Sequence, residues 1–433
     1  MSAYRAWAYS PPKPQAATRP AWRNAGLPER NPVLPFGNGR SYGDSCLNST
    51  GTVIDSRSLD HVLEFDRKTG RIRGESGLLL ASLHNITLAA GWFVPVTPGT
   101  SYVTLGGALA NDVHGKNHHR DGCFGNHVLA FELCRSDGSR VICSPTSNEH
   151  LFAATIGGLG LTGFVTWVEF QLLPVESSLM DVNTRVFYGL DEFMALSAES
   201  HDSHQYSVAW LDCVASGKNF GRGIFIQANH SQQSAAGLSA SGSGGGLPVP
   251  MDFPGWALNR VSVRAFNELY FHKHRLMSLG DSTQPFQRYF YPLDSLQHWN
   301  RIYGSGGFYQ YQFVVPLTNT EALTEVLKRI VRSGQGSFLA VLKLFGSCQS
   351  PGLMSFPEEG PCLALDFPNK GKKTLDLLDD LDSVVTEANG CVYPAKDNRM
   401  SAAAFQQYFP QMNEFAQHID PGFSSDFWRR VSD

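Results

Sequence analysis

The segment at residues 111–119 constrains this chain most, because its composition does not suit a hydrophobic core. It reads Asn-Asp-Val-His-Gly-Lys-Asn-His-His and directly follows residues 104–110, most of which have small side chains. Small residues let a backbone come close to a ligand, and polar side chains beside them can then act on that ligand. We therefore interpret the two segments together as part of a site for a large ligand.

Two further glycine-rich segments strengthen this interpretation. They lie at residues 37–45 and 157–163. Neither of them, nor the stretch at 98–107, fits a Rossmann fingerprint, which requires G-x-G-x-x-G after a strand and before a helix, with an acidic residue about 20 further on. None of the three fits the pattern of a P-loop either. Consecutive backbone amides in such loops bind anions, and glycine allows close approach to a diphosphate. Three separate clusters indicate a long dinucleotide such as FAD that lies across a domain.

Composition and charge exclude some classes of function. The chain has 433 residues, which is enough for two or three domains, and 42% of them are hydrophobic. The net charge of −4 gives no global electrostatic reason to bind nucleic acid, so we set that class aside.

The cysteines and the N-terminus indicate a cytoplasmic protein. None of the eight cysteines forms a C-x-x-C pair or has zinc-ligand spacing, which fits a reducing compartment. The first residues lack the apolar region of a signal peptide. The sequence has no window of about 18 apolar residues, so no transmembrane helix is expected. Peripheral contact with the inner face of the cell membrane stays open.

Periodicity predicts an α+β chain with two domains. In the first half, residues 10–35 are expected to form an irregular arm and residues 78–90 a helix that ends at Gly91. Strands are expected at residues 52–55, 61–66, 71–76, 129–135, 139–143 and 164–173. In the second half, strands are expected at residues 207–212, 223–227, 308–315, 338–345 and 362–367, and helices at 320–333 and 375–388. The low-complexity segment at 231–247 is either a disordered insertion or a lid over a substrate site.

Several polar residues are candidates for chemistry. His114 and Lys116 lie in the opening segment and could act in catalysis or bind a cofactor. His118 and His119 could suggest a metal, but no carboxylate lies at ligand spacing, so we predict no metal site.

The second half adds a polar face and a charged turn. Gln310 and Gln312 share one face of a predicted strand, with Tyr309 and Tyr311 on the other. That face could line a polar pocket near Lys343, or it could be exposed to solvent. Residues 393–399 concentrate charge beside a strand end, as a functional loop or a solvated turn would.

These motifs make the chain resemble the vanillyl-alcohol-oxidase-type FAD-linked oxidases. The resemblance runs from about residue 34 to the C-terminus. It is carried by Gly-Arg-Ser-Tyr-Gly-Asp at residues 39–44, His-Gly-Lys-Asn-His-His at 114–119 and Gln-Tyr-Gln-Phe at 310–313. The other matching segments lie at residues 94–100, 124–128, 160–163, 291–294, 299–301, 343–346, 366–368 and 395–397.

The resemblance implies an architecture and a cofactor. A PCMH-type FAD-binding domain is expected from residues 1–177 and 391–433, and a substrate-binding domain with an antiparallel sheet from residues 178–390. Tyr42 stands where many relatives attach flavin through a histidine, so FAD is expected to bind without a covalent bond. The expected FAD contacts are Gly37, Asn38, Gly39, Arg40, Ser41, Tyr42, Gly43, Asp44, Ser45, Gly99, Thr104, Leu105, Gly106, Gly107, Asn111, Asp112, Val113, His114, Val165 and Tyr393.

The resemblance also implies a reaction. Its nearest branch oxidises the 2′-hydroxyl of a polyprenylphosphoryl ribose to a ketone, which a separate NAD(P)H-dependent short-chain reductase converts to the arabinose epimer used in cell-envelope polysaccharides. Lys396, Tyr393 and His114 are the expected catalytic groups, with Lys396 acting as a base or as an electrostatic anchor. Lys116, Gln310, Gln312, Lys343 and Lys396 are the expected substrate contacts.

Two other functions compete with this one. The chain could be an FAD-dependent oxidase of a soluble alditol, sugar or aldonolactone, or a flavin-binding protein without enzymatic activity. The polar residues of the second half favour the lipid-linked sugar.

One position departs from the family pattern. Some members carry a cysteine two residues before the aspartate at position 366, where this chain has Ala364. Cys362 would share the face of Ala364 but lie two residues along the strand. A reactive thiol at the usual place is therefore not expected.

Overall fold

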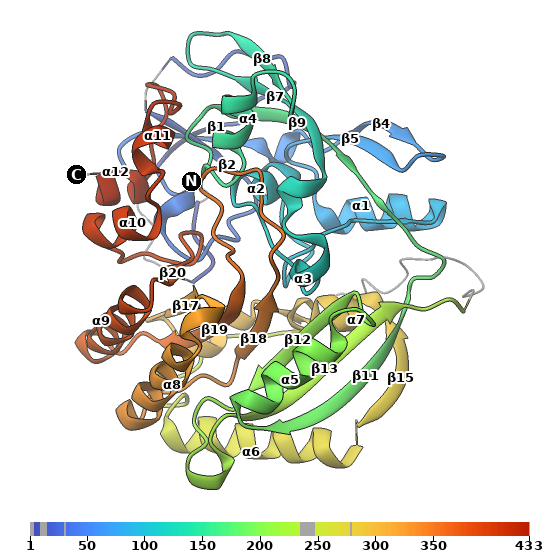
Figure 1. Ribbon diagram of the computed structural model, residues 1–433. Helices are drawn as coiled ribbons and strands as arrows, with labels where there is room; N and C mark the ends of the chain where they lie inside the picture. Colours follow the sequence, from blue (N-terminus) through green and yellow to red (C-terminus); the bar gives the residue numbers. More distant parts are fainter. Residues whose placement is uncertain (1–3, 9–14, 30–31, 234–246, 278, 433) are drawn as a thin grey trace.

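The computed structural model describes residues 4–8, 15–29, 32–233, 247–277 and 279–432. Residues 234–246, the greater part of the predicted lid or insertion, lie outside the described residues. The chain folds into an α+β structure with two groups of sheets, as the sequence predicted (Figure 1).

The N-terminal part contains one parallel and one antiparallel sheet. The parallel sheet has the order β1 (Ala16–Thr18), β3 (Thr52–Asp55) and β2 (Val33–Phe36). The predicted irregular arm therefore contains β1 and the start of β2, which corrects that expectation. Strands this short leave little periodicity in the sequence, and both depend on pairing with β3.

The antiparallel sheet was largely predicted from the sequence. Its order is β4 (Val62–Asp66), β5 (Arg71–Glu75), β9 (Phe164–Gln171), β7 (Val128–Cys134) and β8 (Arg140–Cys143). Gly138 has φ 84°, the left-handed conformation that the tight turn between β7 and β8 needs. The helices of this part are α1 (Leu80–Thr87), α2 (Leu105–Ala110), α3 (His118–Asp121) and α4 (Glu149–Thr155).

The C-terminal segment returns to the N-terminal part. The helices α10 (Ala402–Tyr408), α11 (Met412–Ala416) and α12 (Asp426–Ser432) lie beside it (Figure 1). Arg430 forms an ion pair with Asp44 at 2.8 Å. These contacts agree with an FAD-binding domain made from both ends of the chain, whose boundaries stay a prediction.

The second group is an eight-stranded antiparallel sheet. Its order is β15 (Gly280–Pro285), β11 (Leu179–Tyr188), β13 (Arg222–His230), β12 (Tyr206–Leu211), β18 (Ala340–Phe345), β19 (Gly360–Pro368), β17 (Phe308–Val314) and β20 (Cys391–Val392). Because β20 pairs with β17, the first residues after position 390 belong to this sheet. Two pairs of short strands, β6 (Trp92–Phe93) with β10 (Leu173–Pro174) and β14 (Leu247–Pro248) with β16 (Leu296–Gln297), lie outside the large sheets.

Strand alternation gives the large sheet two different faces. One face is apolar and packs against α5 (Leu190–Ser200), α8 (Glu321–Ser333) and α9 (Lys372–Glu387). The other face carries Gln310 and Gln312 and is partly covered by α6 (Arg260–Met277), while α7 (Phe286–Phe290) follows β15. The sequence did not predict α6, because its outer side carries apolar residues and so gives no clear polar stripe.

Among the described residues, no helix has both the length and the apolar content that crossing a bilayer requires.

A buried ion cluster fastens α6 to the large sheet. The Arg222 guanidinium donates two hydrogen bonds to Asp212, at 3.0 and 2.8 Å, and lies 2.8 Å from Glu268 of α6. Asn267 donates to the other Asp212 oxygen at 2.9 Å. The Arg222 side chain is 3% exposed, so loss of its charge would leave Asp212 buried without a cation.

We therefore expect Arg222→Met to lower the free energy of unfolding by about 3–5 kcal/mol, measured by urea denaturation. Arg185→Met is the matched control, because the Arg185–Glu199 pair also joins two elements of this region but is exposed. Arg185→Met should lower the free energy of unfolding by less than about 1 kcal/mol. Equal losses in the two variants would contradict the assigned role of Arg222.

Candidate active site

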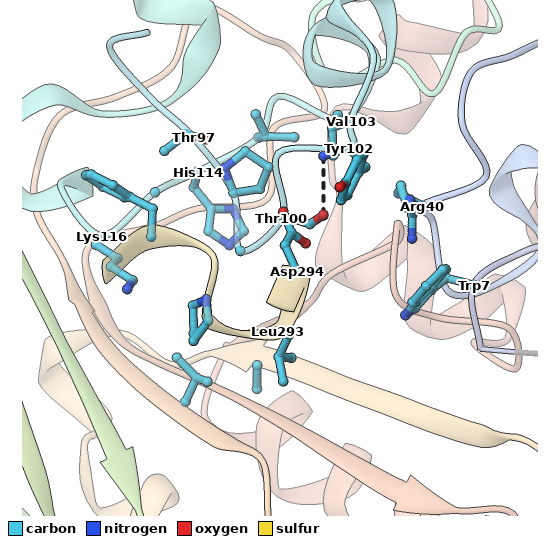
Figure 2. Close-up of a pocket in the computed structure, with 18 of the residues that line it drawn as sticks. Trp7, Arg40, Thr97, Thr100, Tyr102, Val103, His114, Lys116, Leu293 and Asp294 are labelled. Carbon is cyan, nitrogen blue, oxygen red and sulfur yellow. Dashed lines mark hydrogen bonds between the residues drawn. The ribbon is translucent and has the colours of Figure 1, made fainter. Parts of the chain in front are cut away.

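A cavity of about 1110 Å³ lies between the N-terminal part and the large sheet. This volume exceeds the range of about 300–1,000 Å³ that is typical of ligand pockets. All three glycine-rich segments of the sequence contribute to its walls. Figure 2 shows Lys116 and Arg40 at opposite sides of the view, with His114 between them. The cavity is therefore large enough for a dinucleotide together with a second molecule.

Most of the predicted site residues meet in this cavity. All five predicted substrate contacts line it, as do the three predicted catalytic residues. The predicted cofactor contacts that line it are Gly37, Asn38, Gly39, Arg40, Ser41, Tyr42, Ser45, Gly99, Thr104, Gly106, Gly107, Asn111, Val113, His114, Val165 and Tyr393.

Four predicted cofactor contacts lie outside the lining and have structural partners instead. Asp44 binds Arg430, and Leu105 is buried in a hydrophobic cluster. The Asp112 carboxylate accepts from the Gly125 amide at 2.7 Å and from two serine hydroxyls. A Cβ atom on Gly43 would lie 1.6 Å from the Asp397 carbonyl oxygen, so Gly43 is needed for close backbone packing.

The first glycine cluster has unused hydrogen-bond donors, as a diphosphate site requires. Within the described part of the chain, the backbone amides of residues 38–41 have no acceptor. Buried polar atoms of Arg40, Ser45 and Ser76 likewise have no partner there. The second cluster differs, because the Gly106 amide already donates to the Ser76 carbonyl at 2.7 Å. The residues present therefore fit FAD, with the first cluster as the anion cradle.

His114 is a buried, neutral imidazole. The Gln312 side-chain amide donates to His114 Nε2 at 2.7 Å, so Nε2 is the unprotonated nitrogen. Burial, with the nearby charges of Lys343 and Lys396, holds the pKa of His114 well below its usual value. Tyr393 packs against His114, and its hydroxyl donates to the Asn111 carbonyl at 2.8 Å. Both side chains therefore shape the cavity in uncharged form.

Three lysines place unusual charge in the cavity. Burial and the charge of Lys343 lower the pKa of Lys116 to about 7, and its ammonium lies 4.1 Å from the Tyr289 ring centre. Burial also lowers the pKa of Lys343. The pKa of Lys396 falls to about 7 through burial and Lys343, against the opposing effect of Asp366. Three mutually repelling amines in one cavity favour an anionic ligand.

Asp366 is a functional candidate that sequence reasoning did not single out. Its buried carboxylate accepts a hydrogen bond from Gln310 at 2.6 Å. Burial raises the pKa of Asp366 to about 7, and Gln310 and Lys396 oppose that rise. The motif at residues 366–368 was visible in the sequence. The contact between Asp366 and Gln310 depends on the register of β17 with β19.

Cys362 is placed as the sequence predicted. Its sulfur accepts from the Gln312 amide at 3.4 Å, and burial raises the pKa of the thiol to about 11. Ala364 lines the cavity and Cys362 does not. The thiol is therefore protonated and sheltered.

The second half of the cavity has an apolar wall beside polar and charged lining residues, among them Lys273, His274, Asp281 and Arg288. It is formed by the face of the large sheet that carries Gln310 and Gln312, and it extends to the C-terminal end of α6. Its apolar lining residues are Val182, Val208, Trp210, Ile226, Leu339 and Val341, with Tyr270 and Met277 from α6.

Comparison with known proteins identifies the relatives of this chain. Residues 17–144 match a family model described as an FAD binding domain. The chain is 36% identical over 413 residues to decaprenylphosphoryl-β-D-ribose oxidase of Mycolicibacterium smegmatis. The aligned residues cover 92% of this chain and 89% of that protein. The chain is 33% identical to an uncharacterized protein of Streptomyces coelicolor, over 82% of this chain and 100% of that protein. It is 28% identical over 169 residues to L-gulonolactone oxidase of Mus musculus, over 38% of this chain and 38% of that protein.

Gly99 tests whether this cavity holds the flavin. A Cβ atom at Gly99 would meet no protein atom within 4 Å, and Gly99 lines the cavity. We expect Gly99→Val to leave the stability of the flavin-free protein unchanged and to reduce the flavin bound per chain at least several-fold, measured by absorbance after gel filtration. Gly255→Val is the control, because its Cβ would also meet open space and it lies away from the cavity. Full flavin content in Gly99→Val would place the cofactor elsewhere.

Proposed function

The chain belongs to the family of FAD-linked oxidases that includes decaprenylphosphoryl-β-D-ribose oxidase, and from this premise we propose that it oxidises the 2′-hydroxyl of a polyprenylphosphoryl ribose. One observation carries the substrate class. A single cavity joins an anion cradle, a cluster of lysines and an apolar wall that reaches α6. A free alditol or aldonolactone would not need the apolar wall, so we do not favour the soluble-sugar alternative.

FAD is the cofactor, and when bound it supplies the acceptor for the hydride removed from the alcohol carbon. Residues 38–41 would bind its diphosphate. We further propose that it binds without a covalent bond. Burial raises the pKa of the Tyr42 phenol well above its usual value, so this side chain is not a nucleophile. Acid precipitation of the protein should therefore leave the flavin in solution.

Lys396 is the proposed base that takes the hydroxyl proton. A base works best when its pKa is close to the working pH, and the pKa of Lys396 is about 7. Its amine lies 3.7 Å from the centre of the Tyr42 ring, so it is held at one place in the cavity. The charge of Asp366 raises the pKa of Lys396. Asp366 is therefore a positioning residue.

The other polar groups are assigned to binding and orientation. Lys116 and Lys343 would neutralise the substrate phosphate, since both bring positive charge to the cavity wall. Gln310 orients Asp366, and Gln312 orients His114. None of these roles requires His114 to carry a charge.

Flavin reduction without oxygen tests the proposed reaction. Polyprenylphosphoryl ribose should bleach the flavin absorbance of the purified protein, whereas free alditols and lactones should not. Bleaching by a free polyol or lactone alone would replace the proposal with the soluble-sugar alternative. If none of these compounds bleaches the flavin, the proposed oxidase activity is wrong, and the third hypothesis, a flavin-binding protein without enzymatic activity, replaces it.

The pH dependence of flavin reduction tests Lys396. A base must be neutral, so the reduction rate should rise with pH and level off above about 7. Asp366→Asn removes a negative charge that raises the pKa of Lys396, so the rise should move to lower pH. Lys343→Met removes a positive charge that lowers this pKa, so the rise should move to higher pH.

The two variants are matched because they act on the same amine with opposite sign. A rate that falls as pH rises through 7 would instead show that charged Lys396 is needed, as an electrostatic anchor would be. Shifts in the same direction for both variants would remove Lys396 as the titrating group.

The outer side of α6 supports the proposal that the protein binds a membrane surface. Trp256, Leu269 and Leu276 are 77%, 72% and 75% exposed. We call these residues the α6 surface, together with the other exposed apolar residues near them, Met251, Phe253, Val261, Phe266, Met277 and Leu279. Large exposed apolar residues gathered on and just before one helix indicate a contact site.

Charge supports an anionic lipid membrane as the proposed occupant of the α6 surface. The helix carries the exposed cations Arg260, Arg264, Lys273 and Arg275, while its one carboxylate, Glu268, is paired with Arg222. Exposed apolar residues beside basic residues fit an anionic lipid surface. Because the apolar wall of the cavity reaches α6, a membrane at this place could deliver a lipid-linked sugar directly.

Vesicle sedimentation tests this contact. The protein should bind vesicles that contain phosphatidylglycerol more tightly than vesicles of phosphatidylcholine alone. The double substitution Leu269→Glu and Leu276→Glu should weaken binding at least tenfold, because charge on the apolar face opposes insertion. Ile142→Glu, at an exposed apolar residue of β8, is the control. If the double α6 variant and the Ile142→Glu control bind vesicles equally well, the α6 surface would be better explained by a protein partner.

The ketone product requires a second enzyme to become the epimeric alcohol. We propose a separate NAD(P)H-dependent short-chain reductase, and this part of the proposal is supported by the family resemblance alone.

A further inference from the structure

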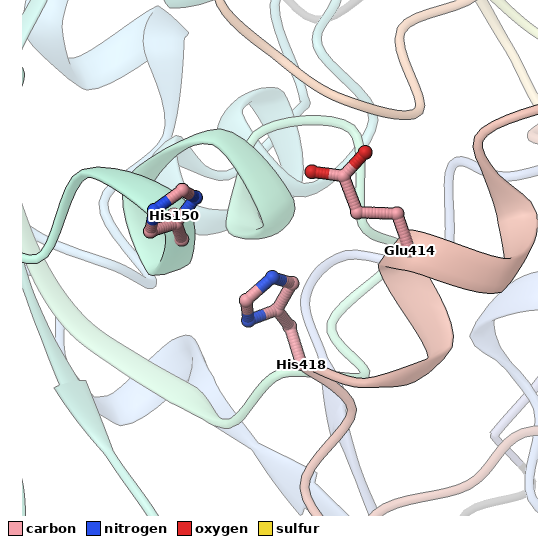
Figure 3. Close-up of side chains that lie close together, drawn as sticks. All are labelled: His150, Glu414 and His418. Carbon is pink, nitrogen blue, oxygen red and sulfur yellow. The ribbon is translucent and has the colours of Figure 1, made fainter.

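Three potential metal ligands meet on the surface of the FAD-binding part, away from the cavity. His150 belongs to α4, while Glu414 belongs to α11 and His418 follows it (Figure 3). Their donor atoms all lie within 4.8 Å of one another. None of the three lines the cavity.

The backbone under each ligand is anchored, although the side chains are accessible. On α4, Phe152 and Ala154 are buried in the hydrophobic cores. On α11, Phe415 is buried and packs edge-on against Trp428. The His418 carbonyl accepts a hydrogen bond from Arg135 at 3.1 Å. The three ligands are therefore presented by fixed elements.

The side chains of the three ligands make no other polar contact in the described part of the chain. No hydrogen bond or ion pair involves their donor atoms there. The two imidazole rings lie parallel, with centroids 6.0 Å apart and an interplanar angle of 5°. Glu414 supplies a carboxylate beside them, so two imidazoles and one carboxylate meet around one point.

We propose that His150, Glu414 and His418 bind a divalent transition metal, with zinc as the best match. Two imidazoles and one carboxylate form a known zinc donor set, which leaves a fourth position for water. Ligand atoms on a tetrahedral zinc lie about 3.4 Å apart. Because His150 and Glu414 are exposed, small side-chain rotations can close the remaining distance.

A metal here would join two distant parts of the chain. The helix α4 lies in the N-terminal segment, while α11 lies in the C-terminal segment that returns to complete the same part of the protein. A bound ion would hold the two together, because it binds only when all three ligands are in place.

Zinc titration of the untagged, flavin-loaded protein tests the site, after removal of metals with EDTA. Calorimetry should show one zinc bound per chain with micromolar affinity, and zinc should raise the melting temperature. His150→Gln and His418→Gln should each weaken binding at least tenfold and abolish the rise. Both variants should keep the wild-type flavin spectrum and the metal-free melting temperature, which confirms that they fold.

His272→Gln is the matched control. His272 lies 3.4 Å from Glu268, four residues earlier on α6, just as His418 follows Glu414 by four residues. Among the described residues, no second histidine joins His272 and Glu268 in a cluster. The His272→Gln variant should bind zinc as the wild type does. Failure of the wild type to bind zinc at about 1 mM, or unchanged binding in both histidine variants, would overturn the proposal.

Discussion

Desolvation of charged groups in the cavity is the constraint on which the site depends. Burial is the largest cause that lowers the pKa of Lys396 and raises that of Asp366, and with the neighbouring charges and hydrogen bonds both stand at about 7. Two groups with such values exchange protons near neutrality, so their titration belongs to the pair. The large sheet stabilises these buried charged groups in two ways. Its other face is packed with apolar side chains, and its hydrogen bonds hold each polar residue in register.

The pleat of the sheet explains why part of the site could be predicted from the sequence. Alternation placed Gln310 and Gln312 on one face, and the structure confirms that this face lines the cavity. The glycine clusters were also visible, because they are local features. Asp44 and Asp112 were predicted to contact FAD, and the structure shows them bound to Arg430 and to serine hydroxyls. Sequence motifs mark a loop, but they do not show which of its side chains face inward.

Features that depend on distant contacts could not be predicted. Asp366 gains its raised pKa from burial under neighbouring strands, which no local pattern reveals. The helix α6 was missed because its exposed side is apolar, which conceals the polar stripe of an ordinary surface helix. The sequence predicted no metal site, because the histidines were judged by spacing along the chain. His150 and His418 meet only after the C-terminus returns to α4.

The segment that carries Lys396 is fixed to both halves of the protein. Its start, β20, pairs with β17 of the large sheet, and the Tyr393 amide donates to the Gln312 carbonyl. Two residues later, the Ala395 carbonyl accepts from the Tyr42 amide at 2.9 Å, within the first glycine cluster. The lysine is thus positioned by cofactor loop and substrate sheet at once. A chimera that exchanges the large sheet between relatives would have to include this crossing strand, because a cut at residue 390 would separate Lys396, the proposed base, from the sheet that positions it.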